Sequence, residues 1–463
     1  MTIHTLAKVA ARRVSRKLGS ACIVLLFCVC SIPRANANAT LFLEEPYSYD
    51  GAFAGTGHAA VYLSNVCATS PVVLRACTVG ESGVVLSRYD GIAGYDWIAI
   101  PLIPYLYAVD QPDAIPLFTD VKLVAFLRDQ YRRAHLEALA PDRSDGGTPD
   151  GNWYELIGAS YDRTIYGFEI ETSSAQDALL ISKFNNHSNR ERYNFVRRNC
   201  ADFGREVINF YYPHAVHRSL IGDLGITTPK QIAKALAKYS RHHPELESST
   251  FLIPQVPGTV RRSKPVHGGL ESIVAAKKYI LPLFFLQPYV AGSLVAGHLS
   301  EGRFDPARHA PILDSRHHLD TPITRADRRS FQSRLDELSR TDSVNDSSKE
   351  TKNWEHLQAA AEPKLNPSGQ PVVEVRVGNE ATQVGISRGD IVSGSESSQL
   401  AARVLEARIY QELRPGAASK TAHSDVEHDL ALLQQLLSDR PKEFAGTLSS
   451  TNEQRTRATA GSQ

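Results

Sequence analysis

The sequence lacks an excess of charge of either sign. Its 463 residues include 51 lysines and arginines and 50 aspartates and glutamates, which gives a formal net charge of +1 at pH 7. Proteins that bind the phosphate backbone of nucleic acids carry clustered positive charge, whereas here the two signs are mixed along the chain. We therefore expect no nucleic acid among the partners of this protein.

A recognisable metal-ligand pattern is also missing. Histidines are paired at His214 and His217, at residues 242–243 and at residues 317–318, but no cysteine or carboxylate joins them at the spacing of a zinc site. Histidines in solvated loops explain these pairs. The sequence therefore predicts neither a metal nor another cofactor.

The first 39 residues have the pattern of a secretory signal peptide. A basic stretch that ends at Lys17 precedes an apolar run over residues 21–30, which is too short to span a bilayer comfortably. The small residues Ala35, Ala37 and Ala39 then form a typical cleavage signature. We expect a signal peptide over residues 1–39 and export to the periplasm or cell envelope. The alternative is an uncleaved N-terminal anchor.

Cysteine is scarce. The sequence has six cysteines, of which three fall in the predicted signal peptide: Cys22, Cys28 and Cys30. The exported chain keeps Cys67, Cys77 and Cys200, and an odd number leaves one thiol over. A disulfide between Cys67 and Cys77, which flank a short segment, is plausible in an oxidising compartment, and Cys200 is then the free thiol. The alternative is three reduced or buried cysteines.

Two short motifs carry the chemistry of the chain. His58 begins a strand-like apolar run within residues 57–63, and Cys200 stands where a loop gives way to a helix-like pattern, within residues 197–203. A cysteine is a strong nucleophile as its thiolate, and a helix N-terminus plus a nearby imidazole lowers its pKa. A histidine fixed on a strand acts as base toward the thiol and as acid toward the leaving group. The motifs predict a catalytic pair in which backbone N–H groups near the cysteine hold the oxyanion.

These residues resemble the circularly permuted papain-like proteins, the group of the lecithin:retinol acyltransferase-like and permuted NlpC-type amidase families. In that group a strand-borne histidine comes first, matched by His58. An Asn-Cys-x-x-Phe-like motif comes later, matched by the sequence Asn-Cys-Ala-Asp-Phe at residues 199–203. Ordinary papain-like enzymes have the cysteine before the histidine. The resemblance covers about residues 41–221 and implies an α+β fold with an antiparallel sheet and a helix that carries the nucleophile.

The family pattern also implies a third polar residue, which orients the imidazole from the strand after the histidine strand. That strand is expected over residues 83–89, which contain no histidine or carboxylate. Ser87 and Tyr89 share one face by strand alternation and either can accept the imidazole N–H, while Asp90 lies just beyond. The expected catalytic residues are therefore Cys200 and His58, with Ser87 or Tyr89 as the third member.

The rest of the predicted catalytic domain, residues 40–221, has an α+β pattern. Apolar spacing predicts a helix over residues 119–139, a strand over residues 161–171, and a helix that Ser173 caps and that runs to Phe184. A short strand is expected over residues 193–196, followed by a helix from Cys200 that Pro213 stops. The aromatic, proline-containing run over residues 95–109 is either a groove wall for an acyl chain or a buried strand and loop.

After residue 221 several prolines interrupt the sequence, and the apolar periodicity of helices and strands is weaker. Residues 222–301 form an extension whose most apolar stretch, residues 279–299, is either a membrane span or a helix packed on the catalytic domain. Residues 302–463 have few large apolar residues, so we expect a mostly disordered tail. Within that tail, strand-like and helical patterns over residues 371–440 indicate a small accessory unit.

Together these features predict an exported cysteine-dependent hydrolase or acyltransferase that acts on amide or ester bonds. Its substrate would be an envelope peptide, peptidoglycan or a lipid, with water or another nucleophile as the acceptor. Membrane association through residues 279–299 belongs to the same hypothesis. The alternative is a non-catalytic envelope module that keeps the papain-like fold for binding and is tethered by that stretch.

Overall fold

The structure is a computed structural model that describes residues 36–47, 54–116, 119, 121–219, 223, 225–256, 260, 263–275, 277–300, 304–306, 361–377 and 380–385. The predicted signal peptide up to residue 35 and most of the predicted tail lie outside these residues. So do the helical patterns of the accessory unit, over residues 399–413 and 425–437.

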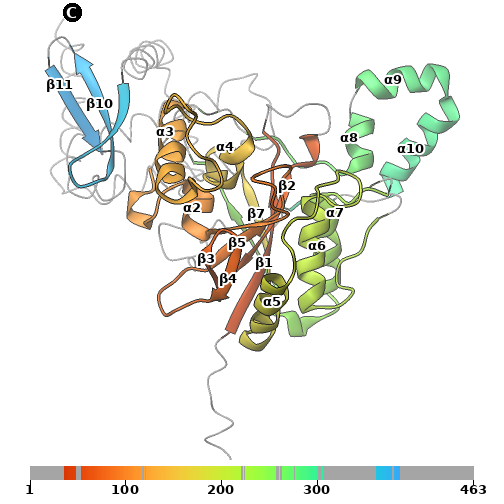
Figure 1. Cartoon of the computed structure of the whole chain (residues 1–463). Coiled ribbons are helices and arrows are strands. Elements are labelled where there is room, and N and C mark those ends of the chain that lie inside the picture. The colour runs from red at the N-terminus through yellow and green to blue at the C-terminus, as the bar shows by residue number, and fades with distance from the viewer. Residues whose placement is uncertain are drawn as a thin grey trace, which may run out of the picture.

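A six-stranded sheet forms the centre of the domain that carries both motifs (Figure 1). Its strands run in the order β6 (Ile98–Pro101), β5 (Val84–Ser87), β2 (His58–Leu63), β1 (Asn36–Glu44), β7 (Ile165–Ser173) and β8 (Ser249–Ile253). Every neighbouring pair is antiparallel. The predicted α+β class with an antiparallel sheet is confirmed.

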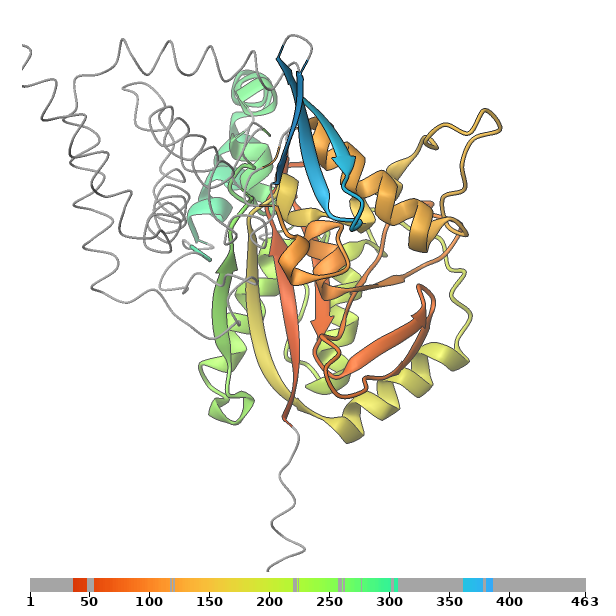
Figure 2. The same cartoon turned by 90° about the vertical axis from the view of Figure 1, so that its left-hand side faces the viewer.

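Both faces of the sheet are buried, because apolar residues follow one another in the central strands. In β1, Phe42 packs in one core cluster while Leu41 and Leu43 pack in the other. Successive side chains of a strand point to opposite faces, so each face has its own core. The helices divide between the faces (Figure 1; Figure 2): α2 (Leu102–Tyr107), α3 (Val121–Tyr131) and α4 (Ala159–Asp162) on the first, and α5 (Ser174–Asn186), α6 (Cys200–Tyr211) and α7 (Pro229–Ser240) on the second.

Several predicted helices form where the pattern places them. The Ser173 hydroxyl accepts from the backbone N–H of Gln176, whose side chain accepts from the backbone N–H of Ser173, so a capping box starts α5. Helix α3 and the π-helical turn η3 (Arg132–Leu136) occupy the predicted helix over residues 119–139. The run over residues 95–109 is core and not a groove wall, since it forms β6 and α2 and every residue of α2 is buried.

The predicted strand over residues 193–196 is wrong. These residues form a turn closed by an isolated bridge between Asn194 and Arg198, and the apolar side chains of Phe195 and Val196 are exposed. The Asn194 side chain accepts hydrogen bonds from the backbone N–H groups of Val196 and Arg197. Such a side chain offers the backbone an alternative to strand pairing, and it outweighs the apolar pattern here.

The folded domain is longer at both ends than the predicted range of residues 40–221. Strand β1 begins at Asn36, with Ala37 and Ala39 buried, so the last residues of the predicted signal peptide belong to the sheet. At the other end α7 and β8 contribute buried residues to the core. Pro229 starts α7 instead of ending the domain, because proline is well tolerated in the first turn of a helix.

Beyond β8 the chain forms three helices, α8 (Gly269–Ala275), α9 (Lys277–Leu286) and α10 (Pro288–Ser300). The described part of the chain contains no helix that combines the length and the apolar character needed to cross a membrane. The stretch over residues 279–299 is therefore not one spanning helix in this structure. The stretch is partly exposed, because Phe285 and Tyr289 lie in solvent while Ile280 and Ala291 are buried.

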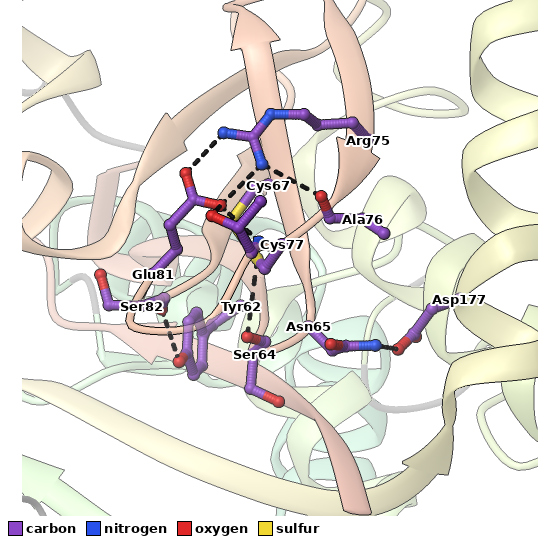
Figure 3. The surroundings of a disulfide bond; sticks show 11 residues. Tyr62, Ser64, Asn65, Cys67, Arg75, Ala76, Cys77, Glu81, Ser82 and Asp177 are labelled. Atoms are coloured by element: carbon purple, nitrogen blue, oxygen red, sulfur yellow. Dashed lines mark hydrogen bonds and ion pairs between the residues drawn. A yellow bond between two sulfur atoms is a disulfide. The ribbon is translucent and has the colours of Figure 1, made fainter. Parts of the chain in front are cut away.

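Two smaller sheets accompany the main one. The hairpin of β3 (Val66–Ser70) and β4 (Val73–Ala76) carries the predicted disulfide between Cys67 and Cys77 (Figure 3), and Cys200 is the free cysteine of the described chain. Strands β9 (Ala361–Leu365), β10 (Pro371–Val377) and β11 (Glu380–Gly385) form an antiparallel sheet, of which β10 and β11 fall within the predicted accessory unit over residues 371–440 and β9 lies before it. The remaining short helices are η1 (Ala54–Thr56), η2 (Pro112–Ala114), η4 (Asn152–Leu156) and η5 (Pro244–Leu246).

Candidate active site

Cys200 is the first residue of α6, and a capping box positions it there. The Asn199 side chain accepts from the backbone N–H of Asp202 at 2.9 Å, and the Asp202 carboxylate accepts from the backbone N–H of Asn199 at 3.4 Å. The Asn199 amide also donates to the backbone carbonyls of Phe195 and Thr227. The order Asn-Cys-x-Asp thereby starts the helix at Cys200, in the first turn as predicted.

Asp202 ties this helix start to the chain that follows the helix. Its side chain is fully buried and accepts from the Thr227 hydroxyl at 2.7 Å and from the Arg218 guanidinium at 2.7 Å. A buried carboxylate needs such partners, and the helix N-terminus is a favourable place for its charge. The start of α6, and with it the position of Cys200, is thus held by charge-assisted hydrogen bonds to Asp202.

A buried arginine, Arg88, contacts the first turn of α6. Its guanidinium pairs with Asp96 at 2.7 Å, donates to the backbone carbonyl of Asn199 at 3.4 Å and lies over the Phe203 ring, 4.9 Å from its centroid. Asp96 also accepts from Arg198 at 2.6 Å. Arg88 and Asp96 were not among the predicted site residues, because their contacts join segments that are far apart in the chain.

His58 is the first residue of β2, and Gly57 turns the chain into that strand. Gly57 has a φ of +69°, and a Cβ at this position would lie 2.0 Å from the backbone oxygen of Glu44. Glycine is therefore required before the histidine. Glu44 is the cross-strand partner of His58, so the two side chains lie on the same face of the sheet.

Two residues at the end of the next strand hold the imidazole of His58. Its Nε2 atom lies 2.6 Å from the hydroxyl oxygen of Ser87. Its ring stacks on the ring of Tyr89, with centroids 4.8 Å apart and planes inclined by 16°. The Tyr89 hydroxyl donates to the backbone carbonyl of Glu155 at 3.0 Å. The structure thus brings both candidate third residues to the imidazole, Ser87 by a hydrogen bond and Tyr89 by its ring face.

The Ser87 hydroxyl has one hydrogen and two acceptors within reach, Nε2 of His58 at 2.6 Å and the backbone carbonyl of Ala59 at 3.5 Å. With its hydrogen toward Ala59, the hydroxyl accepts from Nε2–H of the neutral imidazole. In that tautomer Nδ1 keeps its lone pair, which is the state that a base requires.

The sulfur of Cys200 lies beside the backbone of β2, one residue from His58. The backbone N–H groups of Ala59 and Ala201 are placed to hydrogen-bond with the sulfur, and both favour the thiolate. Since Ala59 follows His58 directly, the helix that carries the thiol meets the strand that carries the imidazole. When a carbonyl carbon bonds to the sulfur, negative charge develops on the carbonyl oxygen. The same two N–H groups are candidate donors to that oxyanion.

Burial dominates the ionisation of both groups. It raises the pKa of Cys200 to about 11, although the N–H groups of Ala59 and Ala201 lower it. It also lowers the pKa of His58 well below the usual range, and the charge of Arg163 lowers it further. The expected lowering of the thiol pKa is therefore wrong, because desolvation of the buried sulfur outweighs the groups that lower it, the two N–H groups and Arg163. At neutral pH the two groups are a neutral thiol and a neutral imidazole.

A buried pair of charges, Glu44 and Arg163, lies near both groups. Beyond the effect of burial, Arg163 lowers the pKa of Cys200 while Glu44 raises it. The carboxylate and the guanidinium are 3.6 Å apart, and the Tyr105 hydroxyl donates to Glu44. Burial raises the pKa of Glu44 against the opposing effects of Arg163 and Tyr105. Glu44 was not predicted, because it is the last residue of an otherwise apolar strand segment and its partners come from distant segments.

The turn over residues 193–196 comes directly before the start of α6. Burial raises the pKa of Tyr193, and the charges of Cys200 and Asp90 raise it further. Phe195 and Val196 follow in the same turn with exposed apolar side chains. The segment that precedes Cys200 in the chain is therefore aromatic and partly apolar.

One group of three side chains in the described chain has its donor atoms close enough to hold a metal: Cys67, Cys77 and Glu81. The two sulfurs are joined in the disulfide, and the Glu81 carboxylate pairs with Arg75 (Figure 3). Zinc binds cysteine as the thiolate, so neither sulfur is free to act as a ligand.

Comparison with family models, with curated proteins and with solved structures gives no match to this chain. A function can therefore be inferred from the residues around Cys200 and not from a relative.

Proposed function

We propose that this protein is a cysteine-dependent hydrolase or acyltransferase that acts on amide or ester bonds, built on a circularly permuted papain-like fold. The observation that carries the proposal is the hydrogen bond between His58 and Ser87. It fixes a neutral imidazole at the start of β2, where the next residue contacts the sulfur of Cys200. A free thiol at a helix N-terminus, a histidine base and a hydroxyl that orients the histidine are the parts of a nucleophilic triad.

The protonation states define the first step. Because thiol and imidazole are both neutral at rest, Nδ1 of His58 takes the thiol proton as the sulfur bonds to the carbonyl carbon. The backbone N–H groups of Ala59 and Ala201 stabilise the oxyanion. The imidazolium then donates its proton to the leaving nitrogen or oxygen, and the acyl group stays on the sulfur. Water or another nucleophile, deprotonated by the same imidazole, releases the acyl group and restores the thiol.

Action outside the cytoplasm is part of the proposal. A disulfide such as Cys67–Cys77 persists in oxidising compartments and is rare where thiols are kept reduced. The signal-like segment before residue 36 supports the same location. Envelope peptides, peptidoglycan and lipids offer amide or ester bonds there and are the proposed substrates.

Trapping of the acyl-enzyme tests this proposal. The protein is incubated with p-nitrophenyl acetate, and intact and peptide mass spectra locate the acetyl group. We expect one acetyl group on Cys200 and none in C200A. The variant H58Q should acylate roughly 100- to 10,000-fold more slowly, which is the usual contribution of a general base. The control H135Q changes an exposed histidine on another part of the domain and should acylate at the normal rate. Acylation of H58Q at the normal rate would contradict the proposal.

A non-catalytic binding module is the second candidate, and the burial of the site favours it. Cys200 is 9 % exposed and His58 is 8 % exposed, so a substrate carbonyl must displace covering side chains to reach the sulfur. An intact protein that binds peptidoglycan or lipid but forms no acetyl adduct on Cys200 would support the module. Adduct formation that depends on His58 would exclude it.

A further inference from the structure

Helices α8, α9 and α10, here called the arm (residues 269–300), stand to one side of the main sheet (Figure 1). Large apolar side chains of α9 and α10 are exposed: Leu281, Phe284, Phe285, Leu286, Tyr289, Val290 and Leu299. At the turn between the two helices the exposed fraction reaches 86 % for Phe285, 76 % for Leu286 and 90 % for Tyr289. Soluble proteins rarely leave such a cluster in water, so this surface has a partner.

The distribution of these side chains identifies the kind of partner. Phe284, Phe285 and Leu286 are consecutive, so they point to different sides of α9 and do not form a single stripe. A helix that docks in a protein groove or against a second copy needs one apolar face, whereas a helix apolar on several sides fits an apolar solvent. No Asp, Glu, Lys or Arg occurs between Lys278 and His298. A lipid bilayer matches this composition.

The lengths of the helices limit how deep the arm can reach. At 1.5 Å per residue, α9 is about 15 Å long and α10 about 20 Å, whereas the hydrocarbon core is about 30 Å thick. Helix α9 runs across the far end of the arm and α10 runs back toward the domain (Figure 1). The two helices therefore do not line up into one long spanning segment. We propose that the arm inserts its α9–α10 turn into a single leaflet and anchors the protein to the membrane surface.

The arm is joined to the catalytic domain next to the histidine strand. The backbone N–H of His267, just before α8, donates to the carbonyl of Gly55 in η1 at 2.8 Å, and η1 ends two residues before His58. Lys230 of α7 pairs with Glu271 of α8 at 2.7 Å. Membrane binding through the arm therefore brings a lipid surface to the part of the domain from which β2 starts. This binding does not depend on the chemistry of Cys200.

Vesicle flotation of the full exported chain tests the proposal. The vesicles contain phosphatidylethanolamine and phosphatidylglycerol at a ratio of three to one. We expect the normal protein to float with them and to remain bound in 1 M NaCl, since apolar insertion is insensitive to salt. The variant F285S/L286S/Y289S should lose partitioning about 100-fold or more, because three large apolar side chains no longer leave water. The variant C200A should float like the normal protein.

A matched control changes three exposed apolar residues outside the arm, as V79S/V121S/L179S, and should float normally. Thermal unfolding of the arm variant should equal that of the normal protein, and a large loss would mean that these side chains pack on the domain, which overturns the proposal. Flotation of the arm variant like the normal protein, or release by salt alone, would also overturn it. So would a protein that does not float and forms dimers that the arm substitutions dissociate, since the partner would then be a second copy.

Discussion

The imidazole of His58 is oriented by a hydroxyl, with Nε2 2.6 Å from Oγ of Ser87. An ionised carboxylate in this place would stabilise the imidazolium and raise the pKa of the histidine. The neutral hydroxyl fixes the direction of the ring without adding charge, so burial and Arg163 keep the pKa of His58 low. The imidazole is thereby held in its neutral form, which is the form that the proposed base needs.

Replacement of Ser87 should separate orientation from charge. In S87A the Nε2 atom of the buried imidazole loses its hydrogen-bond partner, which costs about 1–3 kcal/mol of unfolding free energy. The ring also loses its fixed direction, so we expect acetylation of Cys200 to slow by up to roughly 100-fold, the lower end of a general-base contribution. Urea unfolding and acetylation kinetics measure the two effects.

The matched control for S87A is S87T, which keeps the hydroxyl and adds one methyl group. Its acetylation rate should be close to normal. Equal slowing in S87A and S87T would mean that packing at this position matters and the hydroxyl does not, which would contradict the orienting role of Ser87.

Alkylation of Cys200 should follow the pH dependence of a buried thiol. Since burial raises its pKa to about 11, only a small fraction is thiolate at pH 7. The thiolate is the reacting form, so the rate with iodoacetamide should rise roughly tenfold per pH unit up to about pH 10. The measurement is made without reductant, which keeps the Cys67–Cys77 disulfide closed. A rate that levels off below pH 8 would instead indicate a thiolate–imidazolium pair.

Burial of neutral His58 should lower the stability of the fold in acid. The folded-state pKa lies below the usual 6.5, so above pH 6.5 both states are neutral and the histidine adds no pH dependence. As the pH falls below 6.5, the unfolded chain binds a proton that the folded chain does not. The unfolding free energy then falls by up to about 1.4 kcal/mol per pH unit, until the folded-state pKa is reached.

The variant H58Q isolates this effect from the other titrating groups. Its unfolding free energy, measured in urea at pH 7.5 and at pH 5, should fall less between the two values than that of the normal protein. A larger fall in H58Q would mean that the folded protein stabilises protonated His58, which is the opposite of the expected sign.

Local signals in the sequence allowed us to predict the helix and the strand that carry Cys200 and His58. Contacts between residues that the fold brings together could not be predicted. Asn199 before Cys200, and Ser173 before α5, are capping residues whose effect depends on neighbours three residues away. The pairing of Arg88 with Asp96, or of Arg163 with Glu44, depends on the folded sheet. The raised pKa of the thiol was missed for the same reason, because burial results from packing of distant segments.

The disulfide should stabilise the hairpin of β3 and β4. Cys67 and Cys77 are 10 residues apart, and opening a loop of this size restores chain entropy worth about 3 kcal/mol in the unfolded state. We expect C67A/C77A to lose about that much unfolding free energy in urea while Cys200 keeps its normal alkylation rate. E81Q is the control in the segment that follows the hairpin. It removes the charge that pairs with Arg75 and accepts from Thr78 at the surface, and it should cost far less unfolding free energy than the loss of the disulfide. An equal loss in both variants would contradict a specific effect of the disulfide.

The N-terminus of the exported protein should be Asn38, not Thr40. The small-residue signature permits cleavage after Ala37 or after Ala39. The backbone N–H of Asn38 donates to the Ser64 hydroxyl at 2.8 Å, and its carbonyl accepts from the backbone N–H of Ser64 at 3.0 Å. Cleavage after Ala37 removes the first two pairs of β1 with β7 but keeps these bonds and the whole pairing of β1 with β2, which begins at Ala39.

N-terminal sequencing of the exported protein identifies the cleavage site, and two recombinant chains measure its consequence. The chain that starts at Thr40 lacks the Asn38 bonds and the buried Ala39, so its unfolding free energy should be about 1–3 kcal/mol lower than that of the chain that starts at Asn38. Equal stability of the two chains would show that the start of β1 contributes little to the sheet. Isolation of an exported protein that begins at Thr40 and is fully stable would restore the boundary at residue 39.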